Sequence, residues 1–239
     1  MSIENEIKIV LNPDFNAKAL KGWELKKIRQ GYLGNTAHLI REDKNHFLVY
    51  RDWVGTTRKE LEIRIPVDKN DFDDLWQKCT DKHTRDFFQG KNQSVIETGR
   101  LTSTPRIRQY GDQYLFTYKD WVTGEDVRIE IEDEITKKAF EALWPNCHGT
   151  MYKDRYVKVK NNIEWVVDFM REGDSAGPVY FVLAEAEMPE GMIKPDKTIK
   201  AIRDDVLFEV PKGNKDFSSR KLCDKPYAEK KLEEIRIQP

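Results

Sequence analysis

Charged residues in this chain recur at every second position of segments whose intervening residues are mostly apolar. The first such stripe consists of Glu4, Glu6 and Lys8, and Ile7 and Ile9 fall between or beside its members. Because successive side chains of a strand point to opposite faces, each stripe belongs to one face. Basic side chains bind phosphate oxygens, and carboxylates bind Mg²⁺ or Mn²⁺. A face that combines the two predicts binding of a polyphosphate together with a divalent cation.

Further stripes of this kind follow along the chain. Their members are Arg106 and Arg108; Arg128, Glu130 and Glu132; Lys153 and Arg155; Glu164 and Asp168; and Glu185 and Glu187. A single stripe is usually the wet side of an antiparallel sheet. Recurrence on at least six strands, with apolar and aromatic residues opposite, predicts an α+β protein: an antiparallel β-barrel, or tunnel, with a charged lumen and helices packed outside. Unpaired buried charges are costly, so such a lumen requires a charged ligand.

The elements that position these residues follow from the same alternation. Strands are predicted near residues 3–11, 27–33, 37–42, 46–53, 58–65, 94–101, 105–110, 113–121, 126–133, 151–159, 163–170, 178–187 and 205–210. Helices are predicted near residues 69–79, 81–88, 136–144 and 225–234. The helices with Phe72 and Phe140 are expected to cover the apolar outer face.

An internal repeat relates two parts of the chain without a gap. Tyr50-Arg51-Asp52-Trp53-Val54 matches Tyr118-Lys119-Asp120-Trp121-Val122 at an offset of 68 residues, and each copy ends in Leu-Trp-x-x-Cys, at Cys79 and Cys147. A tandem duplication explains this register better than chance. We therefore expect one domain over residues 1–239, in which residues 35–100 are an inserted, divergent copy of about residues 101–150.

Composition limits the other classes of function. The 41 basic and 42 acidic residues give a net charge of −1, whereas general nucleic-acid binders and membrane-surface proteins are usually more basic. Three widely spaced cysteines predict a reducing, cytoplasmic environment and have no zinc-ligand spacing. Neither a leader peptide nor a membrane-spanning segment is predicted.

Several segments, taken in order, resemble the CYTH domains of the triphosphate tunnel metalloenzymes. They are Glu4-Asn5-Glu6-Ile7-Lys8 (the ExExK signature), Gln30-Gly31-Tyr32-Leu33, Arg106-Ile107-Arg108, Phe116-Thr117-Tyr118-Lys119, Arg128-Ile129-Glu130-Ile131-Glu132, Lys153-Asp154-Arg155-Tyr156, Trp165-Val166-Val167-Asp168, Ala184-Glu185-Ala186-Glu187 and the ending with Phe208-Glu209-Val210 and Pro226-Tyr227. The signature alone is weakly specific, but the ordered set covers nearly the whole chain.

The resemblance implies an eight-stranded tunnel and assigns a role to each matching residue. Phosphate binding would fall to Lys8, Arg106, Arg108, Lys119 and Arg155. Metal binding would fall to Glu4, Glu6, Glu130, Glu132, Asp168, Glu185 and Glu187, with Mg²⁺ or Mn²⁺ as the cofactor. Catalytic roles near the attacked phosphorus would fall to Lys153, Glu187 and Tyr32.

The first copy of the repeat departs from the family pattern. About 70 residues separate Gln30 from Arg106, and the positions equivalent to Arg106 and Arg108 hold His38 and Ile40. The second copy is therefore expected to supply the tunnel. The first copy is expected to widen the barrel, cap one end or mediate self-association, so a homodimer is compatible with the sequence.

Four functions fit these residues. The leading one is metal-dependent hydrolysis of inorganic triphosphate or a small organic triphosphate, and the Gln-Gly-Tyr-Leu strand favours it. The alternatives are a nucleotidyl cyclase that releases pyrophosphate from ATP, an RNA 5′-triphosphatase, and a non-catalytic nucleotide or polyphosphate binder. Apart from such an RNA end, no nucleic-acid partner is expected.

Overall fold

The computed structural model describes residues 5–56, 58–89, 92–121, 128–195 and 197–237. The chain divides into two compact units, Gly31–His148 and Glu4–Gln30 with Gly149–Pro239. Both are built mainly from antiparallel strands, as the alternation predicts, so the α+β class is confirmed.

The first unit holds both copies of the repeat. Its elements are β3 (His38–Glu42), β4 (Asn45–Val54), β5 (Lys59–Pro66), α1 (Lys69–Lys78), β6 (Thr80–Gln89), β7 (Asn92–Arg100), β8 (Arg106–Tyr110), β9 (Gln113–Trp121), β10 (Arg128–Glu134), α2 (Lys137–Leu143) and the 3₁₀ turn η2 (Trp144–Asn146). Two long strands, β2 (Glu24–Leu33) and β11 (Cys147–Lys160), run through both units.

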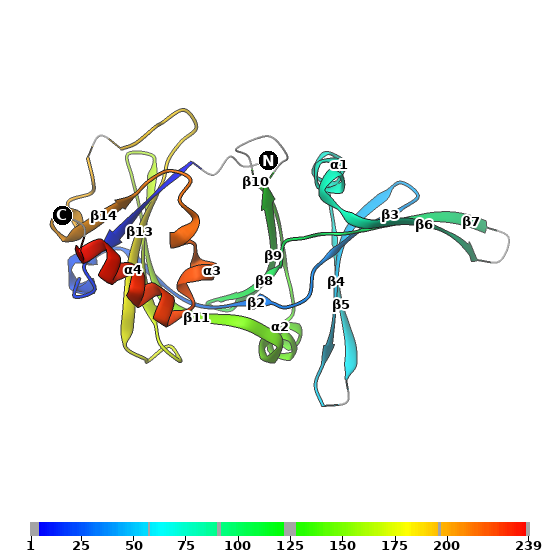
Figure 1. Cartoon of the computed structure of the whole chain (residues 1–239), viewed down its shortest axis with the longest axis horizontal. Coiled ribbons are helices and arrows are strands. Elements are labelled where there is room, and N and C mark those ends of the chain that lie inside the picture. The colour runs from blue at the N-terminus through cyan, green and yellow to red at the C-terminus, as the bar shows by residue number, and fades with distance from the viewer. Residues whose placement is uncertain (1–4, 57, 90–91, 122–127, 196, 238–239) are drawn as a thin grey trace. The chain divides into compact units, whose positions relative to one another are not determined.

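The two copies have the same strand order. One sheet runs β5-β4-β3-β7-β6, and the other begins β10-β9-β8 and continues with β2 and then β11. Figure 1 shows β3, β4 and β5 with the long β6–β7 pair beside them. Each copy is thus a three-stranded meander followed by a helix, and each meander borrows one further strand.

The borrowed strands are exchanged between the copies. β7, which precedes the second copy, pairs with β3 of the first, and the end of β2, which precedes the first copy, lies next to β8 of the second. The backbone N–H of Leu101 donates to the carbonyl of Ala37 at 2.9 Å, and that of Leu33 donates to the carbonyl of Pro105 at 3.0 Å. These two bonds join equivalent positions of the repeat.

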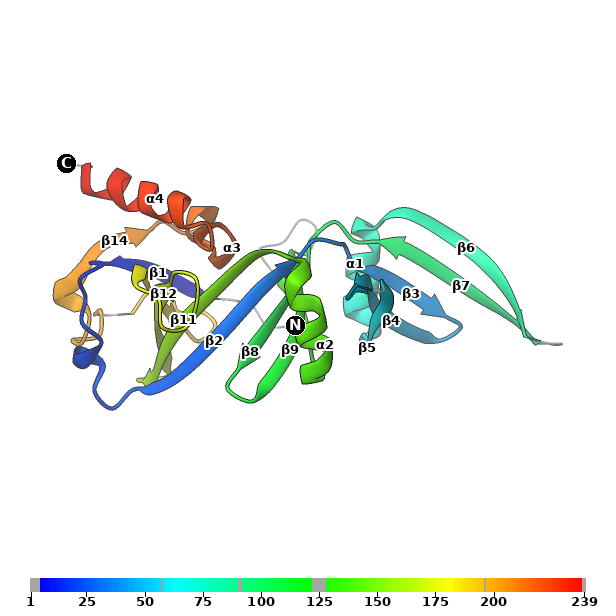
Figure 2. The same cartoon turned by 90° about the horizontal axis from the view of Figure 1, so that it is seen from below.

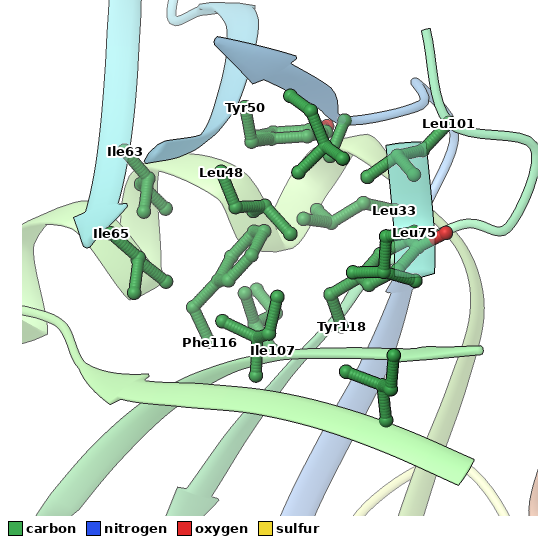
Figure 3. Packing of buried hydrophobic residues seen from close by; sticks show 14 of the residues in the cluster. Leu33, Leu48, Tyr50, Ile63, Ile65, Leu75, Leu101, Ile107, Phe116 and Tyr118 are labelled. Carbon is green, nitrogen blue, oxygen red and sulfur yellow. The ribbon is translucent and has the colours of Figure 1, made fainter. Parts of the chain in front are cut away.

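One core joins the copies, and its members come in equivalent pairs. Leu48 and Phe116, Tyr50 and Tyr118, and Phe72 and Phe140 all pack in it with at most 1% exposure. Figure 3 shows side chains of both copies converging there. The helices α1 and α2 contribute apolar residues to this core, as expected. Trp76 and Trp144 stack on the preceding phenylalanine of their own helix, with ring centroids 5.5 Å apart in both copies.

Small residues permit the close approach of the helices to the borrowed strands. A Cβ on Gly31 would lie 2.4 Å from Sγ of Cys147, and one on Gly99 would lie 2.7 Å from Cβ of Cys79. The cysteines behave as small apolar residues, as predicted: Cys79 is buried, and burial raises the pKa of its thiol to about 11.

The second unit is a sheet with helices and turns around it. Besides β2 and β11 it contains β1 (Glu6–Leu11), η1 (Ala17–Leu20), β12 (Ile163–Arg171), β13 (Val179–Glu187), η3 (Arg203–Asp205), β14 (Val206–Val210), η4 (Lys215–Phe217), α3 (Ser219–Leu222) and α4 (Lys225–Ile237). The strand order is β2-β11-β12-β13-β1-β14.

Each face of this sheet is covered in a different way. On one face Ile9, Trp165 and Val167 pack with Phe15 and Ile202 from the flanking turns. The other face is apolar only in part: Val10, Met170, Phe181 and Leu183 pack with Phe217, Leu222 and Leu232 of the C-terminal elements. Figure 2 shows α4 beside β14 on that side of the unit. The remainder of this second face carries the charged stripes.

Two expectations require correction. The helix predicted near residues 81–88 is wrong, because Thr80–Gln89 forms β6 and pairs antiparallel with β7. Cross-strand hydrogen bonding outweighs any local helical tendency there, and Thr84 and the two phenylalanines favour a strand. The closed barrel is also not seen: the described strands form open sheets. In the second unit, α3 and α4 cover part of the face that a closed barrel would turn inward.

None of the helices within the described ranges is long and apolar enough to cross a membrane.

Candidate functional site

The charged residues of the second unit lie on one face of its sheet. The register places Lys8 opposite Glu185, Glu6 opposite Glu187, and Arg155 opposite Asp168. Residues directly opposite each other in antiparallel strands share a face. The stripes found in the sequence therefore merge into one charged patch, which also includes Lys153.

Asp168 holds the basic side of this patch in place. Its carboxylate is 1% exposed and accepts two hydrogen bonds from the Arg155 guanidinium, at 2.7 and 2.8 Å, and one from Lys153 Nζ at 2.5 Å. Burial alone would raise the pKa of Asp168, but Arg155 and Lys153 together lower it well below its usual range. Asp168 thus positions the two cations rather than standing open to a metal ion.

Lys8 lies on the acidic side of the patch. Its Nζ is 2.6 Å from Oε1 of Glu6 and 3.4 Å from Oε1 of Glu185. Glu185 is in turn 3.6 Å from the Arg155 guanidinium, so one network connects β1, β13, β12 and β11. A phosphate group placed here would meet three basic side chains: Lys8, Lys153 and Arg155.

Three carboxylates stand in a row across adjacent strands. Glu187 lies opposite Glu6 on one side and opposite Glu164 on the other. Partial desolvation and then repulsion from Glu164, Glu185 and Glu6 raise the pKa of Glu187, and Arg155 opposes this only in part. Like charges placed directly opposite are destabilising in a sheet. This row weakens the fold, which suggests that it is kept for another purpose.

The row also tests whether a divalent cation fits. Glu6, Glu164, Asp168, Glu185 and Glu187 carry two more charges than the three basic residues neutralise. One Mg²⁺ or Mn²⁺ would balance that excess with carboxylate ligands of the type it prefers. Within the described ranges, however, no three acidic, His or Cys side chains are already arranged around one metal position. The donor chemistry fits, and binding would require side chains of the row to turn.

The first unit contains the other predicted residues. Glu130 lies between two cations, 2.7 Å from Lys119 Nζ and 3.4 Å from Arg106. The Thr117 hydroxyl donates a 2.6 Å hydrogen bond to Glu132. Arg108 follows Arg106 on the same strand, β8, with the buried Ile107 between them.

Tyr32 belongs to the part of β2 within the first unit, between Gly31 and Leu33, whose alternation points it away from the shared core. Glu4 lies outside the described residues.

The structure thus brings together seven predicted residues in the second unit and six in the first. The former are Glu6, Lys8, Lys153, Arg155, Asp168, Glu185 and Glu187; the latter are Tyr32, Arg106, Arg108, Lys119, Glu130 and Glu132. Glu164 was not among the predicted site residues. The signal was available, since Glu164 shares a face with Asp168, but no family motif includes it.

Comparison with known proteins adds no assignment. No family model matches the chain, no curated protein matches it, and no solved structure matches it.

Proposed function

We propose that the charged patch of the second unit binds a triphosphate with Mg²⁺ or Mn²⁺, and that the chain hydrolyses the terminal phosphate. The observation that carries this proposal is the row of Glu6, Glu187 and Glu164 next to the buried cations Lys153 and Arg155. Phosphate oxygens would satisfy the cations, and the metal would neutralise the row.

The groups of the patch have distinct roles in this proposal. Lys8 and Arg155 hold phosphate oxygens, and Arg155 keeps its charge because Asp168 outweighs the effect of burial on its pKa, which is raised. Lys153, held by Asp168, offers positive charge to the leaving oxygen. A carboxylate of raised pKa is suited to accept the proton of an attacking water, and Glu187 is that residue. A bound divalent cation would supply charge neutralisation and lower the pKa of the attacking water.

Relationship to the triphosphate tunnel metalloenzymes is part of the same proposal. In a closed tunnel of that kind, the charged face would line the interior, and Arg106, Arg108, Lys119 and Tyr32 would add phosphate and catalytic contacts. The sequence motifs support these assignments, and the cysteine usage supports a cytoplasmic location.

The decisive assay measures orthophosphate and pyrophosphate release from inorganic triphosphate, ATP and thiamine triphosphate, with Mg²⁺ or Mn²⁺. Glu187→Gln and Lys8→Met test the patch, and Glu209→Gln is the matched control, because Glu209 lies opposite Ile9 on the other face of the same sheet. We expect orthophosphate release that the first two variants reduce at least about 100-fold and the control preserves. Pyrophosphate release from ATP alone would indicate a cyclase, and absence of turnover with every substrate would contradict an enzymatic role.

A further inference from the structure

A pocket in the first copy of the repeat has the composition of an anion site. It has a volume of about 460 Å³ and is lined by residues of the loop after β2 and of strands β3, β4, β6 and β7. Four of its lining residues are basic or can become so, namely His38, Arg51, His83 and Arg100, and one, Asp81, is acidic. All of these residues belong to the first unit.

The two arginines approach the pocket with their guanidinium groups partly engaged. Arg51 donates from Nε to Glu62 at 2.7 Å, and Arg100 donates from Nε to the Thr36 hydroxyl at 2.9 Å. The terminal nitrogens of Arg100 meet only a distant carboxylate, that of Asp81, at 3.9 Å. Contacts through Nε fix the plane of a guanidinium while its outer edge can still bind a ligand in bidentate fashion.

The two histidines complete the pocket in different ways. His83 is held on both sides, with Nδ1 2.8 Å from the carbonyl of Asp81 and Nε2 2.6 Å from the Thr98 hydroxyl. His38 lies opposite Arg100 across the β3–β7 pair. Burial, and then Arg100, Arg51 and His83, lower the pKa of His38, while Asp81 opposes them. The pocket therefore carries an excess of positive potential that an anion would relieve.

From this arrangement we propose that the pocket is a second anion site, which takes a phosphate group between Arg51 and Arg100 with His38 beside it. Both arginines bind the phosphate oxygens, and the bound anion favours the protonated form of His38. Binding is therefore tighter below the pKa that His38 has in the complex, and it takes up a proton. The site is independent of the function proposed above, because it needs no metal and no residue of the second unit.

The test follows the ring signals of His38 by NMR, in protein with isotope-labelled histidine, with a chelator present. The signal is assigned by its loss in His38→Gln, and the pH titration is repeated with sulfate and with inorganic phosphate. We expect either anion to raise the pKa of His38 by about one unit, a tenfold gain in proton affinity. Arg51→Ala and Arg100→Ala each weaken binding at least about tenfold, and Asp81→Asn, which removes the acidic group, tightens it.

Arg85→Ala is the matched control, because Arg85 is an exposed arginine of the same unit, on β6, that does not line the pocket. Equal loss of binding in Arg85→Ala and Arg51→Ala would overturn the proposal, since it would indicate general attraction to positive charge. So would a titration of His38 that neither anion shifts. Phosphate binding that leaves His38 unchanged and disappears in Lys8→Met would belong to the second unit and would also refute the pocket site.

Discussion

Glu6 on β1 lies directly opposite Glu187 on β13, so two carboxylates occupy a position where neighbouring strands of a sheet usually place compatible side chains. Glu164 extends the repulsion to a third strand. Stability and ligand binding therefore make opposite demands on this row, and the conflict can be measured.

Glu187→Gln should make the metal-free protein slightly more stable. Neutralising the central member of the row removes repulsion on both sides, and because Glu187 is partly exposed we expect a gain of only about 0.5 kcal/mol near neutral pH. Urea unfolding with a chelator measures this gain, with Glu209→Gln as the control from the opposite face. The stabilisation by Mn²⁺ seen in the parent protein should disappear in the variant. A variant less stable than its parent would contradict the repulsion argument.

The same row predicts a pH dependence of opposite sign to that of an ordinary paired carboxylate. The pKa of Glu187 is raised in the folded protein, so the native state binds its proton more tightly than the unfolded chain does. Its contribution to stability is present at low pH and is lost as pH rises from the ordinary pKa of 4.5 through the folded value. The difference in unfolding free energy between the parent and Glu187→Gln, followed from pH 4 to pH 8, should grow with pH.

Asp168→Asn should be strongly destabilising, because it leaves the buried Lys153 without a countercharge and weakens the hold on Arg155. Loss of one partner of a buried ion pair typically costs about 3–5 kcal/mol. The pKa of Asp168 is lowered on folding, so its contribution is present above the ordinary value of 3.8 and is lost as pH falls toward the folded value. The acid limb of the stability profile should therefore flatten in the variant.

The control for that prediction is the double variant Lys153→Met/Asp168→Asn. Removing both members of the pair eliminates the unpaired ammonium, so part of the lost stability should return. If the two substitutions together cost as much as the sum of their separate effects, the pairing described for Lys153 and Asp168 does not contribute to stability.

Gly31→Ala should destabilise the first unit by about 1–3 kcal/mol, since its new methyl group would overlap Sγ of Cys147. Cys147→Ala removes that sulfur and should restore part of the stability when combined with Gly31→Ala, while by itself it should have a small effect. Thermal unfolding of the three variants tests this packing, and an absence of rescue would indicate that the strain arises elsewhere.

Tyr50→Phe and Tyr118→Phe should have equal effects if the two copies are equivalent in energy as well as in geometry. Each buried hydroxyl donates a 2.8 Å hydrogen bond to the aspartate two residues later, Asp52 or Asp120. Loss of each bond should cost about 1 kcal/mol. Denaturant unfolding compares them, and a difference of more than about 1 kcal/mol would show that one copy depends more heavily on this bond.

The sequence was informative about faces and less so about partners. Alternation placed Glu6 and Lys8, Lys153 and Arg155, and Glu185 and Glu187 on the charged side of their strands, and the registers confirm that they share one face. The offset of 68 residues related Tyr50 to Tyr118, whose hydrogen bonds are indeed equivalent. These features depend on local periodicity, which a sequence displays directly.

Pairing and curvature could not be predicted in the same way. Because β7 and the end of β2 have the same pattern, either one could have paired with β3, and nothing local chooses between them. Alternation also indicates which side of a strand is charged without indicating whether the sheet closes. The cover that α3 and α4 place over Met170 and Phe181 depends on long-range packing. The strand at residues 80–89 was missed because its structure depends on pairing with β7.

The exchange of strands between the copies gives the duplication a particular ancestry. A chain with one copy would lack the strand that its meander needs, and a second identical chain could have supplied it, as in a domain-swapped homodimer. Joining two such genes end to end would turn an association that depends on concentration into a permanent one. One half would then be released from its original duty, and the replacement of two arginines by His38 and Ile40 would be a trace of that freedom.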